Sequence, residues 1–124
     1  MLDHVGIQVA DVARANAFYD AVLAPLGFSR LMDFGQAVGF GGADGKPDFW
    51  IGLKTTEALV HEAHIAFQAD SRDGVVAFFE AAVAAGAEVL HEPRVWPEYH
   101  ASYFGAFVRD PDGNNIEAVC HAPE

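Results

Sequence analysis

Apolar and polar positions alternate at the start of each half of the chain. Apolar residues recur at every second position over residues 4–9 and again over residues 64–68. Because successive side chains of a β-strand point to opposite faces, this alternation predicts two strands with one face in a core. The other face of each strand then carries a histidine, His4 in the first half and His64 in the second.

Each of these strands is followed by a segment with the period of an amphipathic helix. Its apolar positions follow the i, i+3, i+4, i+7, i+8 pattern of a buried stripe. They are Ala15, Phe18, Tyr19, Val22 and Leu23 in the first half, and Val75, Phe78, Phe79, Ala82 and Val83 in the second. We expect Asp11 to cap the first helix and Asp70 or Ser71 to cap the second, with Gly27 and Gly86 ending them.

Three short strands are expected after each helix. They lie near residues 28–33, 37–40 and 49–53 in the first half, and near 88–91, 103–109 and 115–121 in the second. Residues 92–101, which include Pro93 and Pro97, are expected to form a longer loop. The order in each half is therefore β-α-β-β-β. This order predicts an α+β fold in which one helix covers the outer face of each mixed sheet and the open inner faces line a cleft.

The two halves also match in sequence. His4 and Gln8 are each repeated 60 residues later, as is the aromatic pair at residues 18–19. The repeat predicts a single domain of 124 residues made of two modules, at about 1–55 and 61–124, with the join near residues 54–62.

Composition narrows the function classes. Hydrophobic residues make up 52% and charged residues 20%, which is typical of a soluble globular protein. Seven Lys and Arg stand against 18 Asp and Glu, giving a formal net charge of −11. Such a charge disfavours nucleic acid and anionic membranes as partners. The single cysteine, Cys120, excludes an intrachain disulfide, and we expect a reduced, cytoplasmic protein without a membrane span or a signal peptide.

Three residues form the strongest candidate site. His4 and His64 occupy equivalent positions in the repeat, and Glu117 lies in the last expected strand. If the two sheets fold around one cleft, the two imidazoles and the carboxylate can form a facial triad on a divalent cation (Fe, Mn, Zn, Ni or Co) with positions left open for substrate. The alternative interpretation is that these are structural histidines and a surface glutamate.

Acid–base groups are the next candidates. Glu117 itself could act as a base, and His100 and Tyr103 lie in or beside the long loop, from which they could supply a general acid or base. The alternative for the loop residues is a surface aromatic cluster. No role is assigned to His121.

The histidine strands and the closing segment together resemble a known family. Residues 4–7, 64–67 and the segment Asp110-Pro111-Asp112-Gly113-Asn114-Asn115-Ile116-Glu117 are similar to the vicinal oxygen chelate superfamily. That superfamily includes glyoxalase I, bleomycin-resistance proteins, fosfomycin-resistance enzymes and extradiol dioxygenases. The resemblance covers nearly the whole chain and implies paired modules with His4, His64 and Glu117 as metal ligands. Glyoxalase I has a fourth ligand on the last strand of the first module, whereas residues 48–53 place aromatic or aliphatic groups at the inward positions.

The resemblance implies a glyoxalase-like, metal-dependent enzyme. Its small substrate would be chelated through two neighbouring oxygens, and the lyase, isomerase, transferase and dioxygenase classes remain open. The resemblance also implies a homodimer, arranged either side by side or with swapped modules. If the modules swap, His4 and His64 could come from different chains. The alternative functions are a metal-free, bleomycin-resistance-like binding protein and a degenerate interaction domain.

Overall fold

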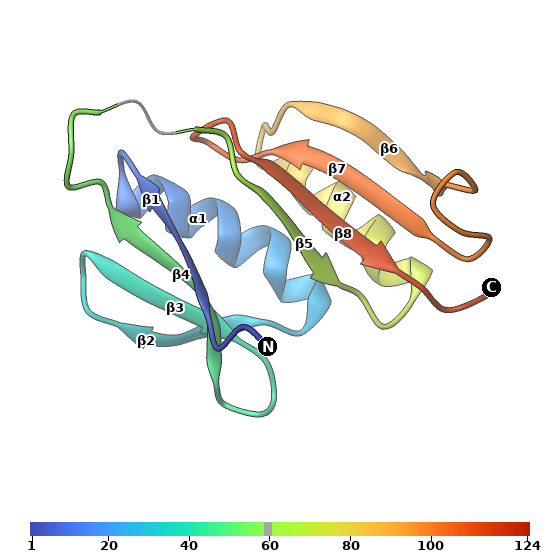
Figure 1. Cartoon of the computed structure of the whole chain (residues 1–124), viewed down its shortest axis with the longest axis horizontal. Helices are drawn as coiled ribbons and strands as arrows, with labels where there is room; N and C mark the ends of the chain where they lie inside the picture. Colours follow the sequence, from blue (N-terminus) through green and yellow to red (C-terminus); the bar gives the residue numbers. More distant parts are fainter. Residues whose placement is uncertain (59–60) are drawn as a thin grey trace.

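The chain folds into two four-stranded sheets, each with one long helix (Figure 1). The computed structural model describes residues 1–58 and 61–124. The first module comprises β1 (Val5–Val9), α1 (Val12–Leu23), the short 3-10 helix η1 (Ala24–Leu26), β2 (Ser29–Asp33), β3 (Ala37–Gly41) and β4 (Pro47–Leu53). The second comprises β5 (His64–Gln68), α2 (Arg72–Ala84), β6 (Val89–Val95), β7 (Phe104–Arg109) and β8 (Asn115–Cys120). The predicted α+β fold with two β-α-β-β-β units is confirmed. The predicted join, residues 54–62, includes residues 59–60, which lie outside the described residues.

The two sheets have the same topology. Their strand orders are β1-β4-β3-β2 and β5-β8-β7-β6. The first strand of each module pairs in parallel with the last, and the other pairs are antiparallel. The last strand of each module, β4 or β8, therefore lies inside its sheet with a neighbour on both sides.

Side-chain caps and glycines set the helix ends. The Asp11 carboxylate accepts a hydrogen bond from the Arg14 N–H at the start of α1, and the Ser71 hydroxyl does the same for Gly74 at the start of α2. Ser71, and not Asp70, is thus the cap of the second helix. Gly27 and Gly86 have φ angles of 84° and 82°, which a residue with a Cβ rarely adopts, so the chain leaves the helical path at both.

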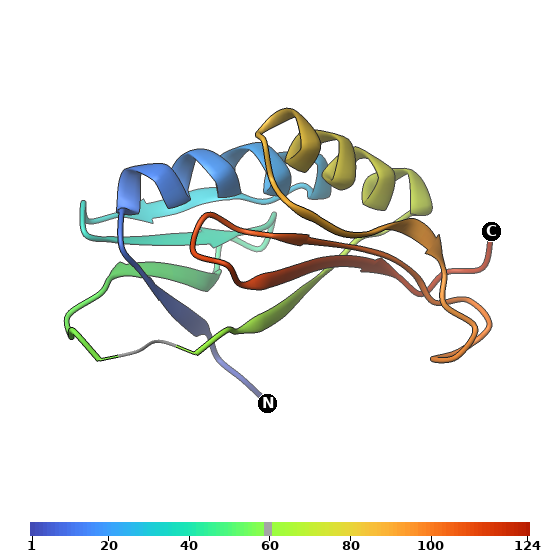
Figure 2. The same ribbon diagram turned by 90° about the horizontal axis from the view of Figure 1, so that it is seen from above.

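Both helices lie side by side over the same face of the two sheets (Figure 2). Their apolar stripes pack into a single cluster of buried residues that draws on both modules. The ring of Phe49 in β4 meets that of Phe67 in β5 edge to face, with centroids 5.0 Å apart. The relative position of the modules is therefore set by hydrophobic packing between them. Within the described residues, no helix is long and apolar enough to cross a membrane.

A buried tyrosine–aspartate pair also ties the modules together. The Tyr19 hydroxyl, in α1, donates to Asp110 Oδ2 at 2.6 Å. Asp110 is 5% exposed and begins the turn between β7 and β8. Burial, followed by the charge of Asp110, raises the pKa of Tyr19 far above its usual range. Tyr19 therefore stays protonated and the hydrogen bond stays intact at neutral pH.

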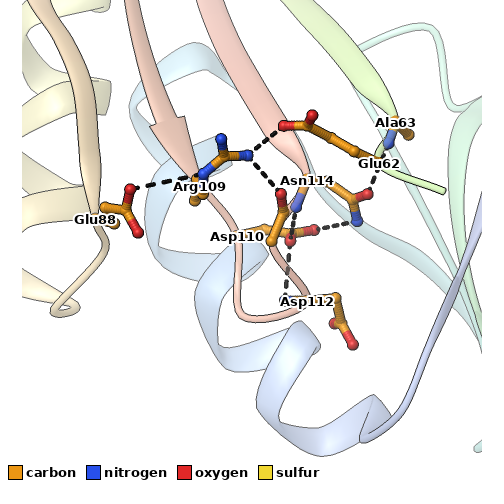
Figure 3. Close-up of polar contacts among 8 residues, drawn as sticks. Glu62, Ala63, Glu88, Arg109, Asp110, Asp112 and Asn114 are labelled. Atoms are coloured by element: carbon orange, nitrogen blue, oxygen red, sulfur yellow. Dashed lines mark hydrogen bonds and ion pairs between the residues drawn. The ribbon is translucent and has the colours of Figure 1, made fainter. Parts of the chain in front are cut away.

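The turn before β8 is held by a polar network (Figure 3). Asp110 Oδ1 accepts from the N–H groups of Asp112 and Asn114 at 3.0 and 2.9 Å. The Asn114 side chain donates to Asp110 Oδ2 at 3.0 Å and accepts from the N–H of Ala63 at 2.9 Å. Arg109 donates to the carbonyl of Gly113 at 2.7 Å and also to Glu62. These bonds fix the start of β8 beside the start of β5, which positions Glu117 relative to His64.

The long loop expected at residues 92–101 begins later than predicted. β6 continues through Pro93 and ends at Val95. A proline is tolerated here because β6 is the edge strand of its sheet, where one N–H can be missing from the ladder. The register shifts between His91 and Arg94, so the strand bulges around the proline.

Candidate functional site

Glu117 is a buried carboxylate in the middle of the second sheet. It pairs with Ala66 of β5 on one side and with Phe107 of β7 on the other. Its neighbours in β8, Ile116 and Ala118, belong to the hydrophobic core. The alternation of β8 therefore turns Glu117 to the opposite face, where it is 1% exposed.

Both oxygens of Glu117 have a hydrogen-bonding partner. His64 Nε2 lies 2.9 Å from Glu117 Oε1. The Tyr103 hydroxyl donates to Glu117 Oε2. No lysine or arginine pairs with Glu117 within the described part of the chain. Burial, followed by the hydrogen bond to Glu117, raises the pKa of Tyr103 well above its usual range, so this phenol is a donor at neutral pH and not a base.

These groups lie at a hollow of about 380 Å³ on the second module. The hollow is bounded by His64, Tyr99, His100, Tyr103, Phe107, Glu117 and His121. The phenol of Tyr103 is the centre of its aromatic wall: the Tyr99 and His100 rings meet it edge to face, with centroids 4.9 and 5.4 Å away. The hydrogen-bonded pair of His64 and Glu117 thus lies among aromatic side chains, a common composition for a small-molecule site.

Four of the five residues expected at a site lie around this hollow. They are His64, His100, Tyr103 and Glu117. His4 does not reach them within one chain: its side chain is 59% exposed, and its Nδ1 lies 2.7 Å from Asp3 Oδ1. β1 begins toward the lower edge and β5 toward the upper edge of the view in Figure 1, and the two strands run in opposite directions. Within residues 1–58 and 61–124, no three His, Cys, Asp or Glu side chains gather closely enough to hold a metal ion. A single chain therefore brings together two of the three expected ligands.

His121 also lies at this hollow, although no role was predicted for it from the sequence. It lines the hollow, and its Nδ1 is 2.8 Å from His100 Nε2. The missed signal was its spacing from Glu117. Alternate residues of a strand point to the same face, and His121 directly follows β8 at an even spacing from Glu117.

The first module has a different residue at the position equivalent to Glu117. Gly6 of β1 pairs with Trp50 of β4, just as Ala66 of β5 pairs with Glu117 of β8. The Trp50 indole donates to the Pro47 carbonyl at 3.0 Å and stacks on Phe34. An aromatic ring thus occupies this position, as expected from residues 48–53.

The family of the chain follows from its match to a family model. The model described as the Glyoxalase/Bleomycin resistance protein/Dioxygenase superfamily matches residues 1–118. The chain belongs to this superfamily. The resemblance inferred from the histidine strands and the closing segment is thereby confirmed. Members of the superfamily typically use a divalent metal, bind small substrates and often dimerise.

Solved structures of the glyoxalase superfamily share this fold. A glyoxalase/bleomycin resistance protein from Albidiferax ferrireducens T118 is 26% identical, with a TM-score of 0.82 over 94% of this chain and 96% of that one. A glyoxalase/bleomycin resistance protein/dioxygenase family enzyme from Burkholderia phytofirmans PsJN is 22% identical, with a TM-score of 0.74 over 98% of each chain. A lactoylglutathione lyase from Agrobacterium tumefaciens is 22% identical, with a TM-score of 0.69 over 94% of this chain and 90% of that one. No curated protein matches the chain.

Proposed function

We propose that this protein is a metal-dependent, glyoxalase-like enzyme whose site combines two chains. His64 and Glu117 of one chain and His4 of a second copy would hold the cation. The observation that carries the proposal is the His64–Glu117 pair, with Nε2 and Oε1 2.9 Å apart at an open hollow. A carboxylate that is 1% exposed is costly unless it is paired or binds a metal, and here its partners are an imidazole and a phenol.

The donor set fits a divalent transition metal. Imidazole and carboxylate suit Zn, Ni, Mn, Fe and Co, and two histidines with one carboxylate leave positions open for substrate. Once bound, the cation would act as a Lewis acid on two neighbouring oxygens of a small substrate. Tyr103 would orient Glu117 through its second oxygen, as outer-shell groups do for metal ligands.

His4 is suited to reach a site on another chain. Its Nδ1 faces the Asp3 carboxylate at 2.7 Å, which leaves Nε2 available as a ligand. The ring is also 59% exposed, and His4 is not among the residues that bound its own chain's hollow. A homodimer in which each chain lends His4 to its partner would supply the third ligand without any change inside the modules.

The position of Trp50 bears on the reaction. A four-ligand site would need another donor from the first module, and Trp50 supplies none at the position equivalent to Glu117. A three-ligand site remains, compatible with lyase, isomerase, transferase or dioxygenase chemistry. Glu117, His100 and Tyr103 are the candidate proton-handling groups. Tyr103, with its raised pKa, can give a proton but not accept one at neutral pH. We also propose a cytoplasmic protein, in keeping with a single, buried and free cysteine.

Metal analysis of untagged protein, purified without chelators, tests this proposal. We expect close to one equivalent per chain after reconstitution, loss of metal in His4→Ala, His64→Ala and Glu117→Gln, and no change in the control His61→Ala. The proposal would be contradicted if the protein held less than a tenth of an equivalent of metal per chain with each of Zn, Ni, Mn, Fe and Co. The metal-free binding function would then take its place.

A mixing experiment tests the sharing of ligands between chains. In a heterodimer of His4→Ala and Glu117→Gln chains, one of the two sites has all three ligands. Random exchange makes half of the dimers mixed, so we expect about a quarter of the wild-type metal to return. If the wild type binds metal but the mixture binds none, the two-chain site is wrong and the metal site itself stands.

A further inference from the structure

His100 and His121 form a hydrogen-bonded pair at the hollow, and neither of them is a proposed metal ligand. His100 Nε2 and His121 Nδ1 are 2.8 Å apart, and the two rings stack with centroids separated by 5.1 Å. His100 lies in the loop after β6, whereas His121 follows the last residue of β8. The fold thus joins two segments at one wall of the hollow.

The hydrogen bonds of this pair fix where the protons lie. The backbone N–H of Ser102 donates to His100 Nδ1 at 3.0 Å, so that nitrogen is an acceptor. In the neutral ring the proton is then on Nε2, from which it is donated to His121 Nδ1. His121 in turn carries its proton on Nε2. Among the described residues no acceptor takes a hydrogen bond from that Nε2–H, which makes it the free polar group of the pair.

The surroundings of the pair indicate the kind of ligand. The side chains of Tyr99, Tyr103 and Phe107 give the hollow aromatic walls, which suit a planar ring. Of the described residues that line it, Glu117 is the only acidic one and none is a lysine or arginine. Arg94, outside this lining, lies over the Trp96 ring and beside Glu98. Without the metal, and with a net charge of −11 on the whole chain, this lining favours an uncharged ligand over an anion.

We propose that His121, held in one tautomer by His100, recognises an acceptor oxygen on a planar, uncharged ligand that stacks in this hollow. His121 is then a specificity-determining residue and His100 a positioning residue that acts through it. This inference rests on the proposed function, because it assigns a substrate class to the same hollow. It does not require the metal, since the hydrogen-bonded pair consists of groups that are not proposed as ligands.

Binding of three matched probes to the full chain, in the presence of EDTA, tests the inference. Acetophenone is planar and has an acceptor oxygen, cyclohexyl methyl ketone keeps the oxygen but is not planar, and toluene is planar without the oxygen. We expect acetophenone to bind at least about fivefold more tightly than either of the others, as measured by titration in ¹H–¹⁵N NMR spectra. Equal affinities, or no binding of acetophenone, would overturn the proposal.

Substitutions in the pair assign the effect to His121. We expect His121→Phe to weaken acetophenone binding about fivefold while toluene binding stays the same, and the control His61→Phe to change neither. Thermal unfolding of each variant shows whether the fold is intact. An unchanged acetophenone affinity in a folded His121→Phe protein would show that the imidazole makes no contact with the oxygen.

The positioning role of His100 has its own measurement. The ¹⁵N shifts of the His121 ring are expected to report the Nε2–H tautomer in the wild type, a mixture of tautomers in His100→Phe, and recovery of the Nε2–H form in His100→Gln, which keeps a donor. A His121 ring that carries its proton on Nδ1 in the wild type would overturn the pairing. EDTA removes metal from all of these measurements. A negative result for ligand binding or for the His121 tautomer is therefore distinguishable from absence of the metal site, which is tested separately by metal analysis.

Discussion

The two modules share one topology but differ at the centre of their inner faces. In the first module Trp50 lies between Gly6 and Gly39, and a Cβ built on Gly39 would come within 2.8 Å of the indole. In the second, Glu117 lies between Ala66 and Phe107. It lines a hollow there and is hydrogen-bonded to His64. One module thus fills this position with its own ring, while the other keeps a buried carboxylate there. A repeated fold can thus place candidate chemistry in one copy and packing in the other.

Single substitutions at these two positions should differ most strongly in their effect on metal binding. Glu117→Gln removes a proposed ligand, and we expect metal affinity to fall on the order of 100-fold or more. Trp50→Phe keeps an aromatic ring and is expected to leave the affinity unchanged. Competition with a coloured chelator measures both. A similar loss in the two variants would remove the proposed distinction between the modules.

Removing the hydrogen bond between Tyr19 and Asp110, which joins the modules, should give the next strongest effect, a loss of stability. Tyr19→Phe leaves the buried Asp110 without one of its donors, so we expect the free energy of unfolding to fall by about 1.5–3 kcal/mol at pH 7. Urea denaturation measures this loss. A change below about 0.5 kcal/mol would show that the pair contributes little.

The same pair predicts a dependence on alkaline pH. The pKa of Tyr19 is raised in the folded state, mainly by burial and by Asp110. Its contribution is therefore complete below the pKa of an unfolded tyrosine, about 10, and is lost as the pH rises above that value. The difference in stability between the wild type and Tyr19→Phe should narrow between pH 9 and about pH 11. A difference that stays constant over this range would contradict the assignment.

Two glycines, one beside Trp50 and one beside Glu117, give a smaller contrast. A Cβ on Gly39 would lie 2.8 Å from both Pro47 and Trp50, so we expect Gly39→Ala to cost about 1–3 kcal/mol. A Cβ on Gly105 would lie 3.2 Å from Glu117 Oε2 and 3.3 Å from Tyr103, contacts that a small shift can relieve. Gly105→Ala should cost less than Gly39→Ala in thermal unfolding. A larger loss of stability in Gly105→Ala than in Gly39→Ala would mean that the residues around Glu117 are packed more tightly than those around Trp50.

The helix caps should show the smallest difference between the modules. Asp11→Ala and Ser71→Ala each remove one hydrogen bond of 3.1 Å to a backbone N–H of the first turn. We expect each to cost about 1 kcal/mol and the double variant to cost their sum. Denaturation of the three variants measures this. Strong non-additivity would show that the two helices depend on each other more than their separate caps indicate.

Much of the fold could be predicted because its signals are local. Alternation at β1 and β5, the stripes of α1 and α2, and the caps Asp11 and Ser71 each depend on a few neighbouring residues. The end of β6 was predicted too early, since a proline ends most strands but is accepted at the edge of a sheet. The edge position is a property of the whole sheet and not of the segment.

The candidate site could be predicted only in part. His64 and Glu117 meet because β5 and β8 are neighbours, which the repeat and the closing segment indicated. His4 lies elsewhere because the arrangement of the modules follows from packing such as that of Phe49 on Phe67, for which no local pattern exists. His121 could have been found from its even spacing to Glu117, but its pairing with His100 depends on the course of the loop.

The hydrogen bond from Tyr19 to Asp110 also bears on how the molecule comes apart. Opening either half would break the hydrogen bond to the Asp110 carboxylate and expose to water the aromatic rings that pack between the halves. Separation of one half before the other is therefore unfavourable. The two halves should therefore melt in one cooperative step. A chain cut between Lys54 and Thr55 should behave as two complementing fragments that hold each other folded.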